Sequence, residues 1–355
     1  MKQIFLESHN IKNQCSGLGQ FNYHLIKGFY ECADDEFKFI VHAKNIKGLK
    51  AEFGDFFMYQ PYFSITRYRY LRLPNKYTIW HSMNQNTKVE PRFEMPYVLT
   101  IHDVHFAEEQ NSDEKASSIK RFKEKLKRAN AIVYISKYAQ KATHRHFDTS
   151  GIPEYIIYNG NPMADTSIPE NYTPDLKISG PYLFTIGEFV PRKNFHVLLE
   201  MLKYLPNHKL IIAGNSDRPY LQKITALITE LSLGDRVFIP GKISETEKKY
   251  HLKNCEAFVF PTLKEGFGIP IIEALSYGTP VITSNNTSLP EVGRTFATYW
   301  ENYEPEYMAQ KVLEGIDLFQ HQDLVENAKK HAQSFSWKNT AQQYLAVYKE
   351  VLKIS

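Results

Sequence analysis

The sequence lacks the features that define several large classes of protein. Its three cysteines, Cys15, Cys32 and Cys255, are widely scattered, so neither a disulfide framework nor a cysteine-based zinc cluster is predicted. No stretch approaches the roughly 20 apolar residues of a membrane span, and the apolar run at the N-terminus is far too short for a signal peptide. The net charge of +4 is small, whereas nucleic-acid-binding domains usually carry a dense basic stripe. We therefore expect a soluble, cytoplasmic protein with no nucleic-acid partner.

Short apolar runs alternate with helical patterns along the entire chain. Short runs that are apolar on both faces are typical of buried parallel strands. The segments between them, such as 196–205 and 220–233, carry apolar residues at helical spacing. This alternation predicts a doubly wound α/β fold. The predicted strands cover residues 3–8, 37–43, 77–82, 96–103, 131–136 and 155–159, and then 182–187, 209–214, 236–241, 256–261 and 280–284.

The length of 355 residues exceeds the size at which one hydrophobic core keeps growing, which favours two domains. The alternating pattern pauses once, over residues 161–180, where three prolines occur without any periodicity. Such a segment is typical of an interdomain linker. Because each side of it supplies five or six predicted strands, we expect two similar sheets joined near residue 175.

The segment 264–282 carries the first candidate site. It predicts a strand end, then Glu265 and the loop Gly266-Phe267-Gly268, then a helix that begins near Pro270. We place Glu273 in the first turn of that helix, where the helix dipole favours an anion. Free N–H groups in such a loop can bind a phosphate or sugar oxygen, and the two carboxylates can accept hydrogen bonds from hydroxyls. The alternative is that both glutamates are solvated surface groups.

The second candidate site follows the strand that ends at Gly187, where Arg192 and Lys193 precede a helix. Two cations at the start of a helix oppose its dipole unless an anion lies between them. A diphosphate is the obvious candidate for that anion, and a solvated basic turn is the alternative.

Glu265 and Glu273, eight positions apart with Gly-Phe-Gly after the first, resemble the E-x7-E motif of the retaining glycosyltransferases of family 4. The resemblance implies the GT-B fold, in which two facing Rossmann-like domains enclose a cleft. We place the acceptor-side domain at 1–172, the nucleotide-sugar-binding domain at 178–336, and a last helix, 338–355, back on the first domain.

The resemblance also implies roles for these residues. Arg192 and Lys193 would bind the diphosphate of the donor, Glu265 the hydroxyls of its sugar, and Glu273 the hydroxyls of its ribose. Relatives often carry an arginine directly after the strand glycine, where this chain has Glu188. Gly187 and Gly214, at strand ends, would approach the nucleotide, and Lys242 and Ile243 lie where the family holds the base.

In the first half, Gly17-Leu18-Gly19 precedes an amphipathic helix. The third glycine of a dinucleotide fingerprint is missing, because Asn22 stands in its place, and no acidic residue ends the second strand. Both departures argue against an NAD-dependent oxidoreductase. In the resembling family such a glycine turn faces the donor phosphates, and the alternative is a turn needed only for close packing.

His102 and Asp103 end a predicted buried strand, at the sheet edge where doubly wound folds bind ligands. His102 resembles the family histidine that contacts the donor sugar, and a purely structural histidine is the alternative. His81 and His105 lie close in sequence, but neither carboxylates nor ligand spacing support a metal site.

The resemblance therefore implies a metal-independent, retaining hexosyltransferase that needs no cofactor beyond its donor. The donor would be GDP-mannose or a UDP-hexose, and the acceptor a hydroxyl of a glycan or lipid-linked molecule in lipopolysaccharide or capsule assembly. The chain has no Asp-x-Asp sequence, which holds a metal on the donor in the other main glycosyltransferase fold. Two alternatives stay open, a sugar-nucleotide epimerase of GT-B type and a non-catalytic nucleotide-sugar-binding protein.

Two basic stretches in the first half, 66–76 and 119–130, mix cations with aromatic and apolar residues. Such a mixture suits peripheral contact with an anionic membrane. The alternative is that Ile119, Phe122 and Leu126 face the core and leave the lysines solvated.

Overall fold

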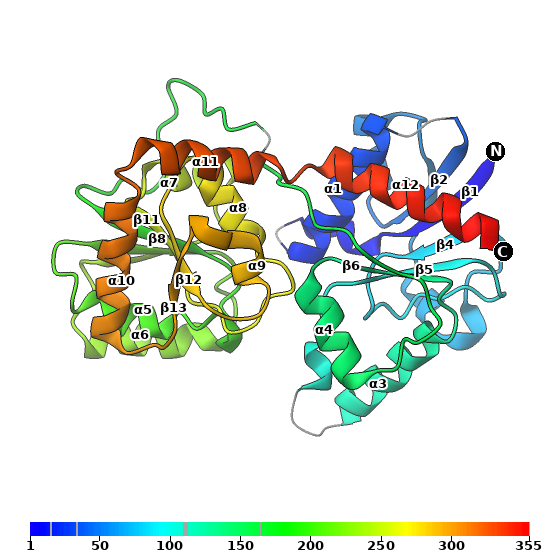
Figure 1. Cartoon of the computed structure of the whole chain (residues 1–355), viewed down its shortest axis with the longest axis horizontal. Coiled ribbons are helices and arrows are strands. Elements are labelled where there is room, and N and C mark those ends of the chain that lie inside the picture. Colours follow the sequence, from blue (N-terminus) through cyan, green and yellow to red (C-terminus); the bar gives the residue numbers. More distant parts are fainter. Residues whose placement is uncertain (15, 33–34, 109–112, 164, 355) are drawn as a thin grey trace. The chain divides into compact units, whose positions relative to one another are not determined.

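The computed structural model divides the chain into two compact units. The first comprises Met1–Gly160 with Phe335–Ser355, and the second comprises Asn161–Ser334. Each unit contains one sheet of parallel strands with helices on its two faces (Figure 1). Cys15 lies outside the described residues. The structure describes residues 1–14, 16–32, 35–108, 113–163 and 165–354.

The first unit ends at Gly160, before the boundary placed at 172 from the sequence, because the following segment packs on the second unit. Asn161 Nδ2 donates hydrogen bonds to Ser276 Oγ at 2.7 Å and to the Ala332 carbonyl at 3.2 Å. The hydroxyl of Tyr172 donates to the Glu247 carboxylate. The proline-rich segment is therefore held by side-chain hydrogen bonds to helices of the second unit.

The sheet of the first unit has the strand order β3-β2-β1-β4-β5-β6-β7, with parallel pairing throughout. Strand β1 lies inside the sheet and pairs Ile4 with Phe39 of β2 on one side and with Ile79 of β4 on the other. All but β3 match predicted runs, since β3 is a short edge strand with no buried residue. The strands are β1 Lys2–Glu7, β2 Phe37–Ala43, β3 Met58–Pro61, β4 Ile79–Ser82, β5 Tyr97–Ile101, β6 Ala131–Tyr134 and β7 Glu154–Ile156.

Helices α1 and α12 lie side by side on one face of this sheet, and α3 lies on the other (Figure 1). Phe122 and Leu126 of α3 belong to the core, and Ile119 packs against it, so this face of the basic stretch 119–130 points inward. The helices are α1 Gly17–Cys32, α2 Ile46–Phe53, α3 Asp113–Leu126, α4 Lys137–His146 and α12 Trp337–Ile354, with short 3-10 turns η1 His9–Lys12, η2 Ser64–Arg67, η3 Arg69–Leu71 and η4 His105–Ala107.

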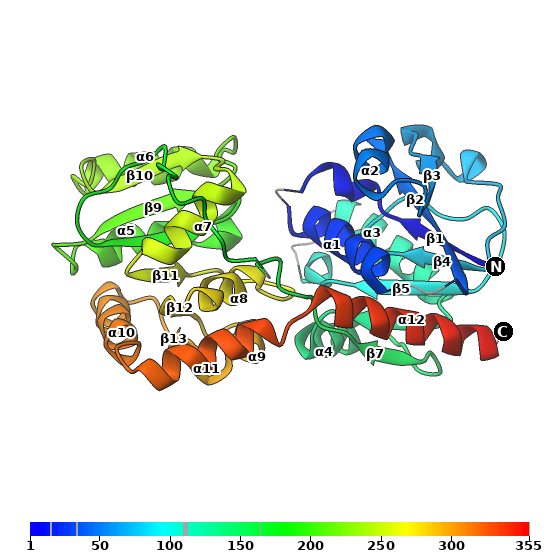
Figure 2. The ribbon, with the colours of Figure 1, turned by 90° about the horizontal axis from the view of Figure 1, so that it is seen from above.

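The sheet of the second unit has the order β10-β9-β8-β11-β12-β13, also parallel throughout. Helices α5, α6 and α10 cover one face, and α7, α8 and α11 cover the other (Figures 1 and 2). The strands are β8 Tyr182–Ile186, β9 Lys209–Ala213, β10 Val237–Gly241, β11 Ala257–Phe260, β12 Val281–Ser284 and β13 Thr298–Trp300. The helices are α5 His196–Leu202, α6 Tyr220–Glu230, α7 Glu245–Asn254, α8 Ile269–Ser276, α9 Leu289–Gly293, α10 Pro305–Leu318 and α11 Gln322–Gln333, with η5 Pro191–Lys193 and η6 Arg294–Phe296.

The chain order reverses once in each sheet, between β1 and β4 in the first and between β8 and β11 in the second. At such a switch point the connections leave in opposite directions, and ligands bind beyond the carboxyl ends of the two strands. Glu7 ends β1, and Glu265 follows β11. The topology thus points to the loops in which the sequence places most candidate residues.

The C-terminal helix α12 is joined to the first sheet by a buried polar network. The two ring nitrogens of His81 are hydrogen-bonded to Thr100 Oγ1 at 2.8 Å and to the Tyr348 hydroxyl at 2.7 Å. Thr100 Oγ1 also lies 2.9 Å from the Tyr344 hydroxyl. Burial lowers the pKa of His81 to about 3, so the ring stays neutral. His81 is therefore a structural residue of the first unit.

We expect Tyr348→Phe to destabilise the protein by about 1–3 kcal/mol, because it leaves a buried nitrogen of His81 without a partner. Tyr70, which is 92% exposed, provides the control, and Tyr70→Phe should change stability by less than about 0.5 kcal/mol. The measurement is the free energy of unfolding in urea. Equal stability of the two variants would show that the network does not hold α12.

Candidate active site

The structure brings candidate residues from four segments of the second unit to one edge of its sheet. Gly187 follows β8, Gly214 follows β9, Lys242 follows β10 and Glu265 follows β11. These strands are neighbours in the sheet, and their parallel direction places all four carboxyl ends at the same edge.

Glu265, Lys193 and Arg192 form an ion cluster at this edge. The Glu265 carboxylate pairs with Lys193 Nζ and lies 3.3 Å from Arg192 Nη1. Thr262 Oγ1 donates a further hydrogen bond to Glu265 at 3.1 Å. Lys193 is only 8% exposed, with its Nζ 4.7 Å from the ring centroid of Phe260. An anion was expected between the two cations, and in this structure it is the carboxylate of Glu265.

Burial and charge act in opposite directions on this cluster. Burial lowers the pKa of Lys193, and the neighbouring Glu265 carboxylate opposes that shift. Burial alone would raise the pKa of Glu265, but the charges of Lys193 and Arg192 lower it overall. Glu265 is therefore ionised at neutral pH. A buried ion pair of this kind leaves an uncompensated charge when one partner is removed.

The loop after Glu265 is fixed by two side chains that follow β12. Ser288 Oγ donates to the carbonyls of Glu265 at 3.0 Å and Phe267 at 2.8 Å, while Thr287 Oγ1 accepts from the Glu265 N–H at 3.2 Å. Gly268 has a φ of +106°, and a Cβ there would lie 2.9 Å from the Leu289 side chain, so glycine is required. The Phe267 side chain is buried. Thr287 and Ser288 are positioning residues that the sequence analysis did not assign.

Glu273 does not lie where the sequence analysis placed it. Helix α8 begins at Ile269, so Glu273 falls beyond the first turn and the dipole argument for it was wrong. It is 2% exposed and pairs with Lys248 Nζ of α7 at 2.9 Å. Burial raises the pKa of Glu273, and Lys248 opposes that shift. Lys248 gave no signal in the sequence, because it lies on α7, far from the motif.

The ends of β8 and β9 approach closely at two glycines. A Cβ on Gly214 would lie 1.9 Å from the Gly187 carbonyl, and Gly214 has a φ of +132°. Its N–H donates to the Gly241 carbonyl at 2.7 Å. Beyond β10, Lys242 is exposed and Ile243 is half-buried. Because these positions are glycines, backbone atoms rather than side chains line this part of the sheet edge.

Glu188, which stands where relatives carry an arginine, pairs with Arg218 at 3.6 Å. Arg218 belongs to the segment between β9 and α6. A cation is thus present beside Glu188, supplied by a different strand end, and the sequence analysis missed it.

In the first unit, His102 follows β5 and is buried against the edge of Phe21, with ring centroids 4.6 Å apart. Its Nε2 donates to the Met83 carbonyl at 2.9 Å, since a carbonyl can only accept. Burial lowers the pKa of His102, so the ring is neutral and Nε2 carries its proton. Asp103 Oδ1 accepts a hydrogen bond from the His105 N–H at 3.2 Å.

The two glycines of the turn in the first unit, Gly17 and Gly19, differ in how closely they are packed. A Cβ on Gly19 would lie 1.8 Å from the Asn13 carbonyl, so Gly19 permits close packing of the turn on α1. Gly17 is exposed, and its Cβ position is open. Packing thus accounts for Gly19 and leaves Gly17 unexplained.

A cluster of titratable residues lies at the ends of β1 and β2, and the sequence analysis did not identify it. His9 Nδ1 lies 2.5 Å from Glu7 Oε1, and His42 Nδ1 lies 3.7 Å from the same oxygen. Burial alone would raise the pKa of Glu7, but the charge of His9 and hydrogen bonds from both histidines lower it overall. The only sequence signal was a titratable residue at each of two predicted strand ends.

Comparisons with known proteins identify the class of protein that has this fold. The structure of Anabaena HepE in complex with UDP and glucose superposes with a TM-score of 0.75 and 17% identity, over 98% of this chain and 99% of that one. The two parallel α/β units are the GT-B fold of glycosyltransferases. Residues 173–332 match the family model described as Glycosyl transferases group 1. Residues 173–332 therefore belong to this family, and the chain is a glycosyltransferase.

Curated relatives match the chain over part of its length. O-antigen chain mannosyltransferase B of Escherichia coli is 25% identical over 281 residues, 73% of this chain and 73% of that protein. O-antigen chain mannosyltransferase RfbU of Salmonella typhimurium is 26% identical over 222 residues, 62% of this chain and 60% of that protein.

We expect Glu265→Gln to destabilise the second unit by about 3–5 kcal/mol, because Lys193 then stays buried without its carboxylate. Glu314→Gln is the matched control, since Glu314 pairs with Lys311 at a partly exposed site. This substitution should cost less than about 1 kcal/mol. Urea unfolding measures both. A loss for Glu265→Gln no larger than for the control would mean that the cluster contributes little to stability.

Proposed function

We propose that this glycosyltransferase moves a hexose from a nucleotide-sugar donor to an acceptor hydroxyl with retention of anomeric configuration. The observation that carries the proposal is the Glu265 carboxylate held between Lys193 and Arg192 at the switch point of the second sheet. Cations and an anion in contact can bind the two halves of such a donor, its diphosphate and its polyhydroxylated sugar.

In the proposed complex the donor diphosphate shares the two cations with Glu265. Lys193 and Arg192 stabilise the negative charge that develops on the leaving diphosphate, and preorganised charges of this kind are the largest contribution to many enzymatic rates. The lowered pKa of Glu265 keeps it an acceptor for sugar hydroxyls. We expect no metal requirement, because these cations supply the charge that a metal supplies elsewhere.

The remaining candidates bind other parts of the donor in the proposal. Gly187, Gly214 and the loop 266–268 approach the nucleotide through their backbones, and Lys242 and Ile243 hold the base. Glu273 takes the ribose hydroxyls, which requires the ribose to reach a side chain that is 2% exposed. In the first unit, His102 contacts the donor sugar as a neutral ring, and Gly17 and Gly19 face the phosphates.

For the donor we propose GDP-mannose or a UDP-hexose. The O-antigen mannosyltransferases among the relatives support the first, and the complex of HepE with UDP and glucose supports the second. We propose as acceptor a glycan or lipid-linked molecule of surface-polysaccharide assembly.

The test compares Lys193→Met with Glu265→Gln, in buffer containing EDTA. Lys193→Met should weaken binding of the matching nucleoside diphosphate at least about tenfold, because it removes a charge-assisted contact. Glu265→Gln should keep that affinity within about threefold but reduce sugar transfer about 100-fold or more. Calorimetry and product analysis by NMR measure the two effects.

Lys203→Met serves as the control, since Lys203 is an exposed cation of the same unit that pairs with Glu200. It should behave as wild type. Unchanged nucleotide affinity in Lys193→Met, or wild-type transfer in Glu265→Gln, would remove that residue from the proposed site. Activity that is lost in EDTA and restored by manganese would contradict the metal-independent mechanism.

We also propose peripheral membrane contact through the segment 63–71 of the first unit. Five large apolar side chains there are between 51% and 92% exposed, and Arg67 and Arg69 lie among them. Exposed rings next to cations suit the interface of an anionic bilayer. Among the described residues, no helix combines the length and apolar character that crossing a bilayer requires. The five are Phe63, Ile65, Tyr68, Tyr70 and Leu71.

The triple variant Phe63→Ser, Ile65→Ser and Tyr70→Ser should bind vesicles containing phosphatidylglycerol about tenfold more weakly than wild type, since it removes apolar area from the interface. A control variant changes three exposed apolar residues of the second unit, Tyr204, Leu313 and Leu318, to serine. Co-sedimentation at low and high salt measures binding. A wild-type protein that fails to sediment even at low salt has no membrane contact of this kind.

A further inference from the structure

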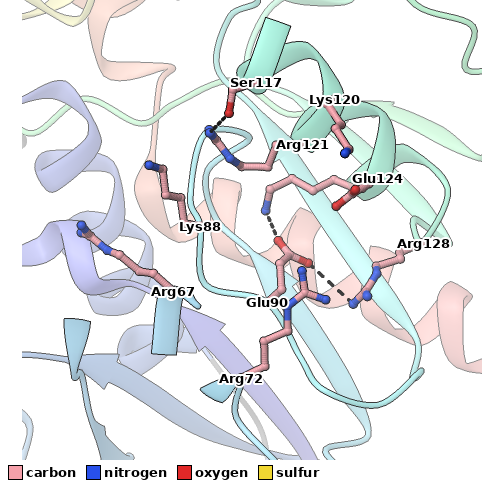
Figure 3. A pocket seen from close by; sticks show the side chains of 10 residues that line it. Arg67, Arg72, Lys88, Glu90, Ser117, Lys120, Arg121, Glu124 and Arg128 are labelled. Atoms are coloured by element: carbon pink, nitrogen blue, oxygen red, sulfur yellow. Dashed lines mark hydrogen bonds and ion pairs between the residues drawn. The ribbon is translucent and has the colours of Figure 1, made fainter. Parts of the chain in front are cut away.

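The two basic stretches, far apart in sequence, line one cavity of about 300 Å³ in the first unit (Figure 3). Arg67 and Arg72 come from the connection after β3, Lys88 comes from the loop after β4, and Lys120 and Arg121 come from α3. In all, seven cationic side chains and two carboxylates line the cavity. None of its lining side chains is hydrocarbon, so the cavity suits a polar, negatively charged ligand.

The inner wall of the cavity is already neutralised. Glu90 is 5% exposed and pairs with Lys125, which is itself buried and donates to Ser82 Oγ at 3.0 Å. Arg128 lies 3.8 Å from the other oxygen of Glu90 and donates to the Pro91 carbonyl at 3.2 Å. The charge of Glu90 is thus balanced mainly by Lys125 and Arg128, its two ion-pair partners.

The outer wall carries cations that lack a carboxylate partner. Arg67, Arg72, Lys88 and Lys120 form no ion pair with any residue that the structure describes. Arg72 Nε is buried without a hydrogen-bond partner. Burial and the charge of Arg128 lower the pKa of Arg72, and the charges of Glu90 and Glu124 oppose that shift only in part. Glu124 is the other lining carboxylate. Like charges held this close repel one another, so an anionic ligand would stabilise the arrangement.

We propose that this cavity is a binding site for a phosphate or diphosphate group. Arginine forks bind phosphate oxygens in pairs, lysines bind them as point charges, and both are present on converging walls. The volume is at the lower end for ligand pockets, which fits a diphosphate with part of an attached group. The site shares no residue with the proposed donor site, because Gly17, Gly19 and His102, the members of that site in the first unit, do not line the cavity.

The site is tested by titrating the protein with inorganic pyrophosphate in a calorimeter. The triple variant Arg72→Gln, Lys88→Gln and Lys120→Gln removes one cation from each of the three segments that form the outer wall, and it should bind at least about tenfold more weakly. The matched control, Lys44→Gln, Lys47→Gln and Lys141→Gln, removes the same charge from exposed positions outside the cavity and should bind as wild type. Lys120→Gln alone, at an exposed position, should weaken binding about threefold without affecting folding.

The donor site could also take pyrophosphate, so the titration is repeated on Lys193→Met protein. The binding event lost in the triple variant must persist there, and the triple variant must keep its affinity for the nucleoside diphosphate. A result that refutes the cavity site therefore does not refute the proposed function, and a result that refutes the proposed function does not refute the cavity site. Wild-type pyrophosphate affinity in the triple variant, or an equal loss in the control, would overturn the proposal.

Vesicles distinguish the two sources of such a phosphate. If the group belongs to a lipid, phosphatidylglycerol vesicles bind wild type at least about tenfold better than the triple variant, pyrophosphate competes, and phosphatidylcholine vesicles do not bind. If it belongs to a soluble molecule, the triple variant loses pyrophosphate but binds the vesicles as the control variant does. Either result supports the site and identifies its ligand class.

Discussion

The ion pair between Lys193 and Glu265 is the constraint on which the candidate active site depends. It joins the segment after β8 to the loop after β11, the two strands on either side of the switch point. A buried lysine needs a carboxylate, and this carboxylate needs a loop held by Thr287 and Ser288. The glycines at 187, 214 and 268 then allow the backbone to approach the same edge. The buried ion pair and the close approach of the backbone therefore occur at the same edge of the sheet.

Most of the fold could be predicted because its strands are buried on both faces, and such strands show as short apolar runs. The structure adds two strands that were not predicted, β3 and β13, and both lie at sheet edges. Edge strands are covered on fewer sides, so β3 has no buried residue and gives no apolar run. The end of the first unit was also hard to place, because the bonds that hold Asn161 and Tyr172 to the second unit are made by partners more than 70 residues away.

The candidate site shows the same limit. The sequence predicted an anion between Arg192 and Lys193 and a loop after Glu265, because both features follow from residues that are close together in the chain. It could not identify Lys248 beside Glu273, Arg218 beside Glu188, or the meeting of Glu7 with His42, because each pair comes from two separate elements. The cavity lined by the two basic stretches could not be predicted from the sequence either. Their charges were visible in the sequence, but their convergence on one cavity depends on the packing of α3 against the loops after β3 and β4.

The most direct test of the account is the coupling energy between Lys193 and Glu265, measured by a double-mutant cycle of Lys193→Met and Glu265→Gln on the free energy of unfolding. In the free protein we expect a coupling of about 1–3 kcal/mol, as for residues in contact. With a saturating nucleoside diphosphate the coupling should fall, because the diphosphate then shares the charge of Lys193. A coupling near zero in the free protein, or one that the nucleotide leaves unchanged, would contradict the central claim.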